Sequence, residues 1–393
     1  MVLFLHNRYR ATGGEERAVD DLMWLVREQL GEPADLLARA SQGLGRARAA
    51  RALLAGGADP GEVERAVRDA GARVVHAHNL HPTFGWRALA AARRAGARVV
   101  MHLHQYRLVC AIGVCFVQGS DCTRCHGRNT LPGVRLNCRG SRGEAVAYGA
   151  ALALWQRRLV GSADAVVVPS VFARERLRDL GVPLPWSRVY VLAPALRDLA
   201  ASRPTGDRQV DSARPAAEAR GGAPGGGRYA LVASRLAPEK GIDVAIEACR
   251  IAKLPLVIAG DGPERAALRA RAAGAEVRFA GHVADAELVR LRAGASIALM
   301  PSRSAETFGL AAAEAMAAGV PVAASRVGAL PELVGEEGLV APGDPDALAG
   351  AMARLIADPG AGERARTRVG ELCAPELVAR RLSAVYDGAP PPA

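Results

Sequence analysis

Short apolar runs alternate with longer segments of helical character along most of the chain. The runs are largely apolar and end in glycine, proline or polar turns, which is typical of parallel strands buried on both faces. The intervening segments are rich in alanine, which favours helices. This alternation predicts an α/β fold with doubly wound parallel sheets. We expect strands at Val2–Leu5, 73–78, 98–102, 163–168, 189–192, 229–233, 256–259, 277–279, 295–300 and 320–324.

One stretch interrupts the alternation and predicts two domains. Residues 197–227 contain several prolines and a run of three glycines, which is the composition of a linker. They separate an N-terminal half at 1–196 from a C-terminal half at 228–370, and 393 residues are enough for two cores. A last helix and a loose tail lie in 371–393. We expect only polar helix and loop at 31–72, a segment rich in alanine, arginine and glycine.

The stretch 301–332 holds the densest candidate chemistry. Glu306 lies in a loop after a predicted strand, and Glu314 lies on the helix that follows. Eight positions at about 100° each leave the two carboxylates within roughly 80° of one helix face, so both can line one crevice. The helix begins near Phe308, where free backbone N–H groups and the positive end of the dipole suit a phosphate. An anion cradle with two carboxylates for hydroxyl groups outlines a sugar-nucleotide site.

A second pair of charges lies between a strand and a helix in the C-terminal half. Arg235 and Lys240 flank this loop, so two cations can converge on a diphosphate while the helix N-terminus adds its dipole. Lysine occurs in the chain only at Lys240 and Lys253, although arginine is abundant. The lysine at this loop position therefore indicates a specific role.

Five of the seven cysteines fall within a segment rich in glycine and arginine. Cys122 and Cys125 form a Cys-x-x-Cys pair, and Cys138 with either Cys110 or Cys115 would complete four thiolates around zinc. We take Cys110, Cys122, Cys125 and Cys138 as the candidate structural zinc ligands, within an insertion at 110–138. The alternatives are reduced thiols in an insertion loop and iron–sulfur ligation. The expected cytoplasmic location disfavours disulfides.

The formal charge of +11 and a pI near 9.9 raise the question of nucleic acid or anionic membrane as a partner. We find no nucleic-acid motif, and arginine is spread through the helices, so a generally basic surface is the preferred interpretation. Peripheral contact with anionic lipid is a secondary alternative. No apolar run reaches membrane-spanning length, and the N-terminus lacks the basic flank of a signal peptide. We expect a cytoplasmic protein, at most peripheral at the inner face of the membrane.

The spacing Glu-x7-Glu, followed by EAMAAGVPV and Gly-x-x-Pro-Glu, resembles the retaining, family 4 type of glycosyltransferase. This resemblance implies the GT-B fold, in which two Rossmann-like domains face each other across a cleft and a C-terminal helix crosses back to the N-terminal domain. The linker would act as a hinge for that cleft. The N-terminal domain would bind the acceptor, and the C-terminal domain the nucleotide-sugar donor.

The resemblance also implies roles for individual residues. Arg235 and Lys240 would neutralise the departing diphosphate, Glu314 would hold ribose hydroxyls, and Glu306 would hold a hydroxyl of the donor sugar. His104 would face that sugar. The remaining donor contacts would come from the glycine-rich loop of Gly13 and Gly14, from the backbone near the base at Gly281 and Val283, and from the helix start at Phe308, Gly309 and Leu310. The loop at 193–196 lacks the asparagine that family members usually carry there, which puts that local contact in doubt.

The expected reaction is retaining sugar transfer from an NDP-sugar to a hydroxyl acceptor, without a metal or other cofactor in catalysis. UDP- and GDP-sugars are the favoured donors. The acceptor is a saccharide, a lipid-linked sugar or a small molecule, in cell-envelope polysaccharide, glycolipid or secondary-metabolite synthesis. One alternative is a GT-B epimerase or phosphorylase. Another is a non-catalytic, basic, zinc-bearing binding protein, although both glutamates and Lys240 argue against lost catalysis.

Overall fold

The computed structural model describes residues 1–8, 14–41, 43–200 and 228–391. The predicted linker at 197–227 lies outside these residues, apart from the short helix α8 (Arg197–Ala200). Gly13 also lies outside them, and Gly14 is the first residue described after that gap. The expectations for the linker and for Gly13 therefore stay predictions.

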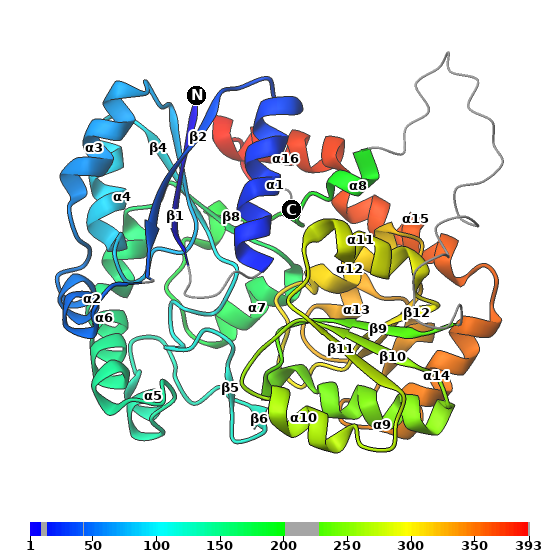
Figure 1. Cartoon of the computed structure of the whole chain (residues 1–393). Coiled ribbons are helices and arrows are strands. Elements are labelled where there is room, and N and C mark those ends of the chain that lie inside the picture. The colour runs from blue at the N-terminus through cyan, green and yellow to red at the C-terminus, as the bar shows by residue number, and fades with distance from the viewer. Residues whose placement is uncertain (9–13, 42, 201–227, 392–393) are drawn as a thin grey trace, which may run out of the picture. The chain divides into compact units, whose positions relative to one another are not determined.

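The chain forms two compact units, each described here by itself. The first unit comprises residues 1–117, 121–195 and 375–393, and the second comprises 118–120 and 196–374. Each contains a six-stranded sheet with helices packed on it (Figure 1). All strand pairs of the two sheets are parallel, which confirms the predicted α/β class with two Rossmann-like sheets.

The sheet of the first unit has the strand order β2-β1-β3-β4-β7-β8. Its strands are β1 (Val2–Arg8), β2 (Ala34–Ala40), β3 (Val74–Ala77), β4 (Arg98–His102), β7 (Ala165–Val168) and β8 (Val189–Val191). A short hairpin of β5 (Phe116–Val117) and β6 (Ser120–Asp121) follows β4. The helical elements are α1 (Gly14–Glu28), α2 (Arg46–Leu54), α3 (Pro60–Asp69), α4 (Gly85–Arg94), α5 (Leu131–Arg135), α6 (Arg142–Gly161), α7 (Val171–Asp179), η1 (Trp186–Arg188) and α16 (Pro375–Asp387).

Alternate residues of β1 serve two separate cores. Leu3 and Leu5 pack in the core that includes α3 and α4, whereas Val2 and Phe4 pack in the core that includes α1 and α16. Because both faces are covered, Val2–Leu5 of this strand is an unbroken apolar run instead of alternating with polar residues. Helix α16 thus packs on the first unit, as the crossover prediction requires, and its Tyr386 hydroxyl lies 2.7 Å from His76 Nδ1.

Strand β2 was not predicted, and its sequence explains why. Its seven residues, ADLLARA, are partly covered or exposed except for the buried Ala34, and the charged Asp35 and Arg39 leave only a three-residue apolar run. It is an edge strand that pairs only with β1, over all seven residues. An edge strand needs less apolar surface than a central one, so pairing with β1 decides its conformation. The expectation of helix and loop alone at 31–72 was therefore wrong.

The sheet of the second unit has the order β11-β10-β9-β12-β13-β14. Its strands are β9 (Ala230–Ala233), β10 (Leu256–Ala259), β11 (Val277–Gly281), β12 (Ile297–Met300), β13 (Val322–Ser325) and β14 (Leu339–Val340). The helical elements, besides α8, are η3 (Pro238–Lys240), α9 (Ile242–Ala252), α10 (Arg265–Arg271), α11 (Asp285–Gly294), α12 (Leu310–Ala317), α13 (Leu330–Leu333), η4 (Glu336–Gly338), α14 (Pro345–Ala357) and α15 (Ala361–Cys373).

The direction of the winding reverses at β9 in this second sheet. The chain runs outward through β10 and β11, then returns to place β12 on the other side of β9. At such a switch point the loops after the two central strands diverge and leave a crevice at the carboxyl ends, where doubly wound proteins bind ligands. The loops after β9 and β12 carry Arg235, Lys240, Glu306 and the residues that lead into α12, which are one part of the predicted donor site.

No helix in the described parts of the chain is both long enough and apolar enough to cross a membrane.

Candidate functional site

The loop after β9 carries Arg235 and is fixed by the turn after β10. The backbone N–H of Leu236 donates to the carbonyl oxygen of Asp261 at 2.9 Å. A Cβ at Gly262 would lie only 2.3 Å from the carbonyl oxygen of Leu236, so the two segments touch where the side chain is missing. The turn at 260–262 is therefore structural, and it sets the backbone on which Arg235 stands.

Side-chain contacts then tie this loop to the one after β12. The Arg235 guanidinium, half exposed, donates to the buried Glu239 carboxylate. The backbone carbonyl of Glu239 accepts from the N–H of Arg303 at 2.8 Å. Arg303 in turn forms two 2.7 Å hydrogen bonds with the Asp243 carboxylate at the start of α9. The two loops therefore form one connected structure.

Gly241 allows the closest approach between these loops. It has a φ of 61° and precedes α9 as its N-cap. A Cβ at this position would lie 2.0 Å from the carbonyl oxygen of Pro301. Glycine meets both requirements, because it tolerates positive φ and has no side chain to clash. Lys240, immediately before it, is thereby held beside the loop 301–309.

Lys240, Glu306 and Ser302 form a hydrogen-bonded group at this junction. Lys240 Nζ donates to Glu306 Oε1 at 2.8 Å, and Ser302 Oγ donates to the same oxygen at 2.6 Å. Burial raises the pKa of Glu306, but the charge and hydrogen bond of Lys240, together with Ser302, outweigh it and leave the pKa below its ordinary value. Glu306 is therefore a carboxylate at neutral pH. The side chains of Lys240 and Glu306 remain 22% and 13% exposed, so a ligand can reach them.

The Gly-x-x-Pro-Glu motif packs against the backbone of Glu306. Gly328 has a φ of 60°, and a Cβ there would lie 2.3 Å from the backbone nitrogen of Glu306. The N–H of Ala329 donates to the Glu306 carbonyl at 2.9 Å. Pro331 then lies in the first turn of α13. Gly328 and Ala329 of the motif therefore pack against the backbone of Glu306.

Helix α12 begins at Leu310, close to the predicted start. Gly309 is its N-cap with a φ of 102°, and it provides no side chain to cap the first N–H groups. A Cβ at Gly309 would lie 2.6 Å from Leu330 Cδ2, so packing on α13 also favours glycine. The preceding residue, Phe308, is buried. A helix start without a side-chain cap suits an anion, as the sequence suggested.

Glu314 is placed differently from Glu306. It lies on α12, is 5% exposed, and pairs with Arg292 of α11, which is 2% exposed. The structure thus brings Glu306 to Lys240 and Glu314 to Arg292, and the shared crevice stays a prediction. The sequence analysis missed Arg292. A signal was present, because Arg292 falls on the same helical face as Leu288, Leu291 and Ala295.

The predicted base contacts lie at and just after the end of β11, an edge strand of this sheet. Gly281 ends β11 with a φ of 72°, and its carbonyl accepts from the N–H of Gly260 at 2.7 Å. Val283 packs against the cluster of Tyr229 and Leu231 while remaining partly exposed. The role of Gly281 and Val283 beside a base remains a prediction.

In the first unit, histidine rings stack across the ends of β3 and β4. His78 Nδ1 lies 2.8 Å from His104 Nε2, and the rings of His102 and His104 are 4.3 Å apart at 11°. Burial lowers the pKa of His104, so its ring is neutral at physiological pH. His76 continues the stack, and burial lowers its pKa to about 3. The predicted contact of His104 with a donor sugar is not tested by this arrangement.

Among the described residues, His76, His78 and His102 form the one set whose candidate ligand atoms lie within 4.8 Å of one another. Their rings are near parallel, with interplanar angles of 24° and 13° for His76 with His78 and His102. Imidazole lone pairs lie in the ring plane, so stacked rings direct them side by side instead of toward one ion. His76 also uses both nitrogens, toward Tyr386 and His102. The stack is therefore a core network.

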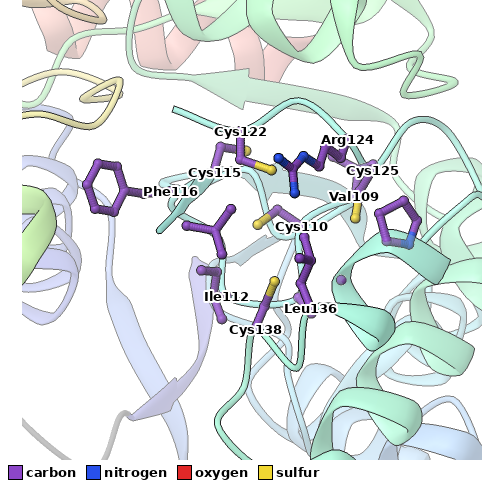
Figure 2. Close-up of a pocket in the computed structure, with 14 residues that line it drawn as sticks. Val109, Cys110, Ile112, Cys115, Phe116, Cys122, Arg124, Cys125, Leu136 and Cys138 are labelled. Carbon is purple, nitrogen blue, oxygen red and sulfur yellow. The ribbon is translucent and has the colours of Figure 1, made fainter. Parts of the chain in front are cut away.

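The cysteine segment forms a pocket of its own in the first unit (Figure 2). All five clustered cysteines line it, together with residues of α5, and none of them forms a disulfide. The Cys115 thiol donates to Cys110 and lowers the Cys110 pKa to about 6, helped by nearby backbone N–H groups and opposed by burial. Burial raises the pKa of Cys125 to about 11.

Comparison with protein families matches both halves of the chain. Residues 7–194 match the model described as a glycosyl transferase 4-like domain, and residues 213–371 match the model of glycosyl transferases group 1.

Curated relatives match parts of the chain. A GDP-mannose-dependent alpha-(1-6)-phosphatidylinositol dimannoside mannosyltransferase of Mycobacterium tuberculosis is 40% identical over 141 residues, or 34% of this chain and 36% of that protein. A D-inositol 3-phosphate glycosyltransferase of Acidothermus cellulolyticus is 36% identical over 299 residues, or 69% of this chain and 62% of that protein. The match thus spans less than two thirds of either relative.

Solved structures match over almost the whole chain. HepE of Anabaena in complex with UDP and glucose is 17% identical, with a TM-score of 0.61, over 98% of this chain and 99% of that one. Sucrose-phosphate synthase from Thermosynechococcus elongatus is 19% identical, with a TM-score of 0.64, over 98% of each chain. These likenesses establish the GT-B fold. The two family models, which together match most of the chain, show that it belongs to the family 4 type of glycosyltransferases.

Proposed function

We propose that this protein transfers a sugar, with retention of configuration, from a nucleoside diphosphate sugar to a hydroxyl acceptor. One observation carries the proposal: Lys240, Glu306 and the uncapped start of α12 meet at the switch point between β9 and β12. This is the place in a doubly wound sheet where a phosphate-bearing ligand binds. The group offers a cation, a carboxylate and backbone donors, which are the chemical partners of a sugar diphosphate.

The positively charged residues and backbone N–H groups of the site would bind the diphosphate of the donor. Negative charge grows on the leaving diphosphate as the bond to the sugar breaks, and preorganised positive groups lower that barrier. Lys240 would supply a fixed charge and Arg235, whose side chain is half exposed, a second one. The N–H groups at Phe308, Gly309 and Leu310 would add backbone donors and the helix dipole. No metal ion is needed to balance this charge.

In this proposal Glu306 binds Lys240 and also a hydroxyl of the donor sugar. In the ligand-free arrangement it holds Lys240 in place and is itself kept ionised. When a diphosphate binds Lys240, the carboxylate can accept a hydrogen bond from a donor-sugar hydroxyl. As a carboxylate with a lowered pKa, Glu306 is a hydrogen-bond acceptor and not a general acid. The leaving phosphate would then take the acceptor proton, in a front-face reaction.

Glu314 would bind the ribose hydroxyls, with Arg292 as its positioning partner. The ion pair with buried Arg292 holds the buried Glu314 carboxylate in one orientation. Gly14, Gly281, Val283 and His104 complete our set of candidate donor contacts, together with Gly13. The alternative pyridoxal phosphorylase would need a lysine free to form a Schiff base, and the ion pair of Lys240 with Glu306 disfavours it.

UDP and GDP are the favoured nucleotides. HepE is described in complex with UDP and glucose, and the mycobacterial relative as GDP-mannose-dependent. The acceptors in the names of the relatives, a phosphatidylinositol dimannoside and an inositol phosphate, carry sugar or polyol hydroxyls. We therefore propose an acceptor of this class, in glycolipid or polysaccharide synthesis on the cytoplasmic side of the membrane.

The two lysines offer a matched test of the diphosphate site. Replacing Lys240 by arginine keeps the charge but cannot keep the single 2.8 Å contact with Glu306. We expect kcat/KM for nucleoside diphosphate release from the donor to fall by about 10²- to 10³-fold. The same replacement at Lys253 should change it less than about twofold. Equal activity of Lys240→Arg and Lys253→Arg would contradict the assignment.

The pH dependence of stability tests the state of Glu306. Its pKa in the folded protein is below the ordinary value of 4.5, so the ionised group stabilises the fold above that pH. This contribution is lost as the pH falls below about 4.5 and through the lowered pKa. We expect the Tm of wild type to decline more steeply than that of Glu306→Gln between about pH 6 and pH 3. Glu287→Gln, on the surface of α11, should follow wild type.

Thermal unfolding with a panel of nucleotides tests the donor class and Glu314 together. One of UDP, GDP, ADP, CMP and dTDP should raise the Tm of wild type, since a ligand at 100 times its Kd stabilises by about 2.7 kcal/mol. Glu314→Gln should lose that response.

The double variant Arg292→Met with Glu314→Met separates binding from folding in this test. It removes both buried charges, so its own stability should stay near that of wild type. It should nevertheless fail to respond to the nucleotide. A full nucleotide response from this variant would exclude Glu314 from the site.

A further inference from the structure

The strongest unassigned feature is the pocket in the first unit that five cysteines line (Figure 2). It is built from the end of the segment after β4, the β5 strand, the Cys-x-x-Cys turn and helix α5. The transferase reaction proposed above uses none of these residues. We propose that Cys110, Cys122, Cys125 and Cys138 bind one zinc ion in a closed, structural tetrathiolate site that fixes this segment.

The pocket brings the Cys-x-x-Cys pair, Cys122 and Cys125, together with Cys110 and Cys138. Cys115 also lines the pocket, and its thiol donates to Cys110. A tetrahedral site needs four ligands, so we assign Cys115 as a hydrogen-bonding partner of the Cys110 ligand and not as a fifth ligand.

The backbone after Cys110 forms a tight turn. The N–H of Gly113 donates to the Cys110 carbonyl at 3.0 Å. Gly113 has a φ of 83°, and a Cβ there would lie 2.3 Å from Gln105 Oε1. This turn places Cys110 and Cys115 in the lining of the same pocket.

Helix α5 contacts the second half of the cluster. The N–H of Gly133 donates to the Thr130 carbonyl at 3.1 Å, and a Cβ at Gly133 would lie 3.4 Å from the Cys125 sulfur. Cys115 itself has a φ of 50°, a conformation that residues with a side chain seldom adopt. Helix α5 and the turn that contains Cys115 therefore both lie against the cysteine pocket.

The segment contains little regular secondary structure. Between β4 and α6 it contains only two two-residue strands and one five-residue helix. Side chains tie it to α6: Gln156 donates to the carbonyls of Leu108 and Gly127, each at 2.9 Å, Thr130 donates to Gly149 at 2.7 Å, and Arg128 and Arg139 bond to Ala153 and Glu144. Short stretches with little regular structure usually depend on a metal or a disulfide for stability.

Charge and chemistry favour zinc with four thiolates. A zinc ion with four thiolates carries two net negative charges, and Arg124 of the Cys-x-x-Cys turn lines the pocket beside them (Figure 2). Tetrahedral zinc with Zn–S bonds of about 2.3 Å would bring the sulfurs within roughly 3.8 Å of one another. No three sulfurs in the described residues are within 4.8 Å of each other, so zinc binding would contract the pocket. Four protein ligands leave no position for water, so the ion is structural.

Metal analysis of the full chain, purified without a histidine tag and under reducing conditions, tests the proposal. We expect about one zinc per chain, released when a mercurial reagent titrates the thiols and detected with a chromogenic chelator. Cys122→Ser and Cys125→Ser should each lose most of that zinc. Cys115→Ser and Cys249→Ser, the latter a buried cysteine of the second unit, should keep it.

A conservative variant distinguishes loss of a ligand from loss of the fold. Cys122→His keeps a zinc-binding side chain, so it should retain zinc and a higher Tm than Cys122→Ser. Absence of zinc from wild type would overturn the proposal, as would iron with an absorption band in the visible range. It would also fail if Cys115→Ser lost zinc as completely as Cys122→Ser.

Discussion

The close approach of two loops at the carboxyl end of one sheet determines the chemistry of the second unit. Strands β9 and β12 are neighbours only because the winding reverses between them, and their loops therefore start side by side. Gly241 lets those loops touch, since a Cβ there would fall 2.0 Å from the Pro301 carbonyl. Any larger residue would separate Lys240 from Glu306. The positions of the cation, the carboxylate and the helix start all follow from this contact.

Electrostatics explains why the site keeps its shape without a ligand. A lysine and a glutamate that both lose water gain from pairing, and Ser302 supplies a further donor to the same oxygen. Behind them, the Arg303 pair with Asp243 and the Gly328 contact fix the two backbones. The site is thereby organised before a donor arrives. Preorganised charges cost no rearrangement when the diphosphate begins to leave, which is how electrostatic catalysis gains its strength.

The sequence allowed much of the fold to be predicted because central parallel strands are covered on both faces and so are apolar throughout. It failed at β2, whose edge position relaxes that requirement. Residues next to motifs were found by their spacing, as with Arg235, Lys240 and the start of α12. Two partners were not found. Arg292 reaches Glu314 from another helix, so tertiary packing places it. Ser302 is only four residues from Glu306, but the path of the loop that joins them has no regular period to predict from.

The central claim is that a nucleoside diphosphate binds at the switch point between β9 and β12. The most direct measurement is a crystal structure of the protein with the nucleotide that gives the largest thermal shift. The account predicts diphosphate oxygens within hydrogen-bond distance of Lys240 Nζ and of the backbone N–H groups at the start of α12. A nucleotide whose phosphates lie elsewhere, for example at the ends of β1 and β3, would contradict it.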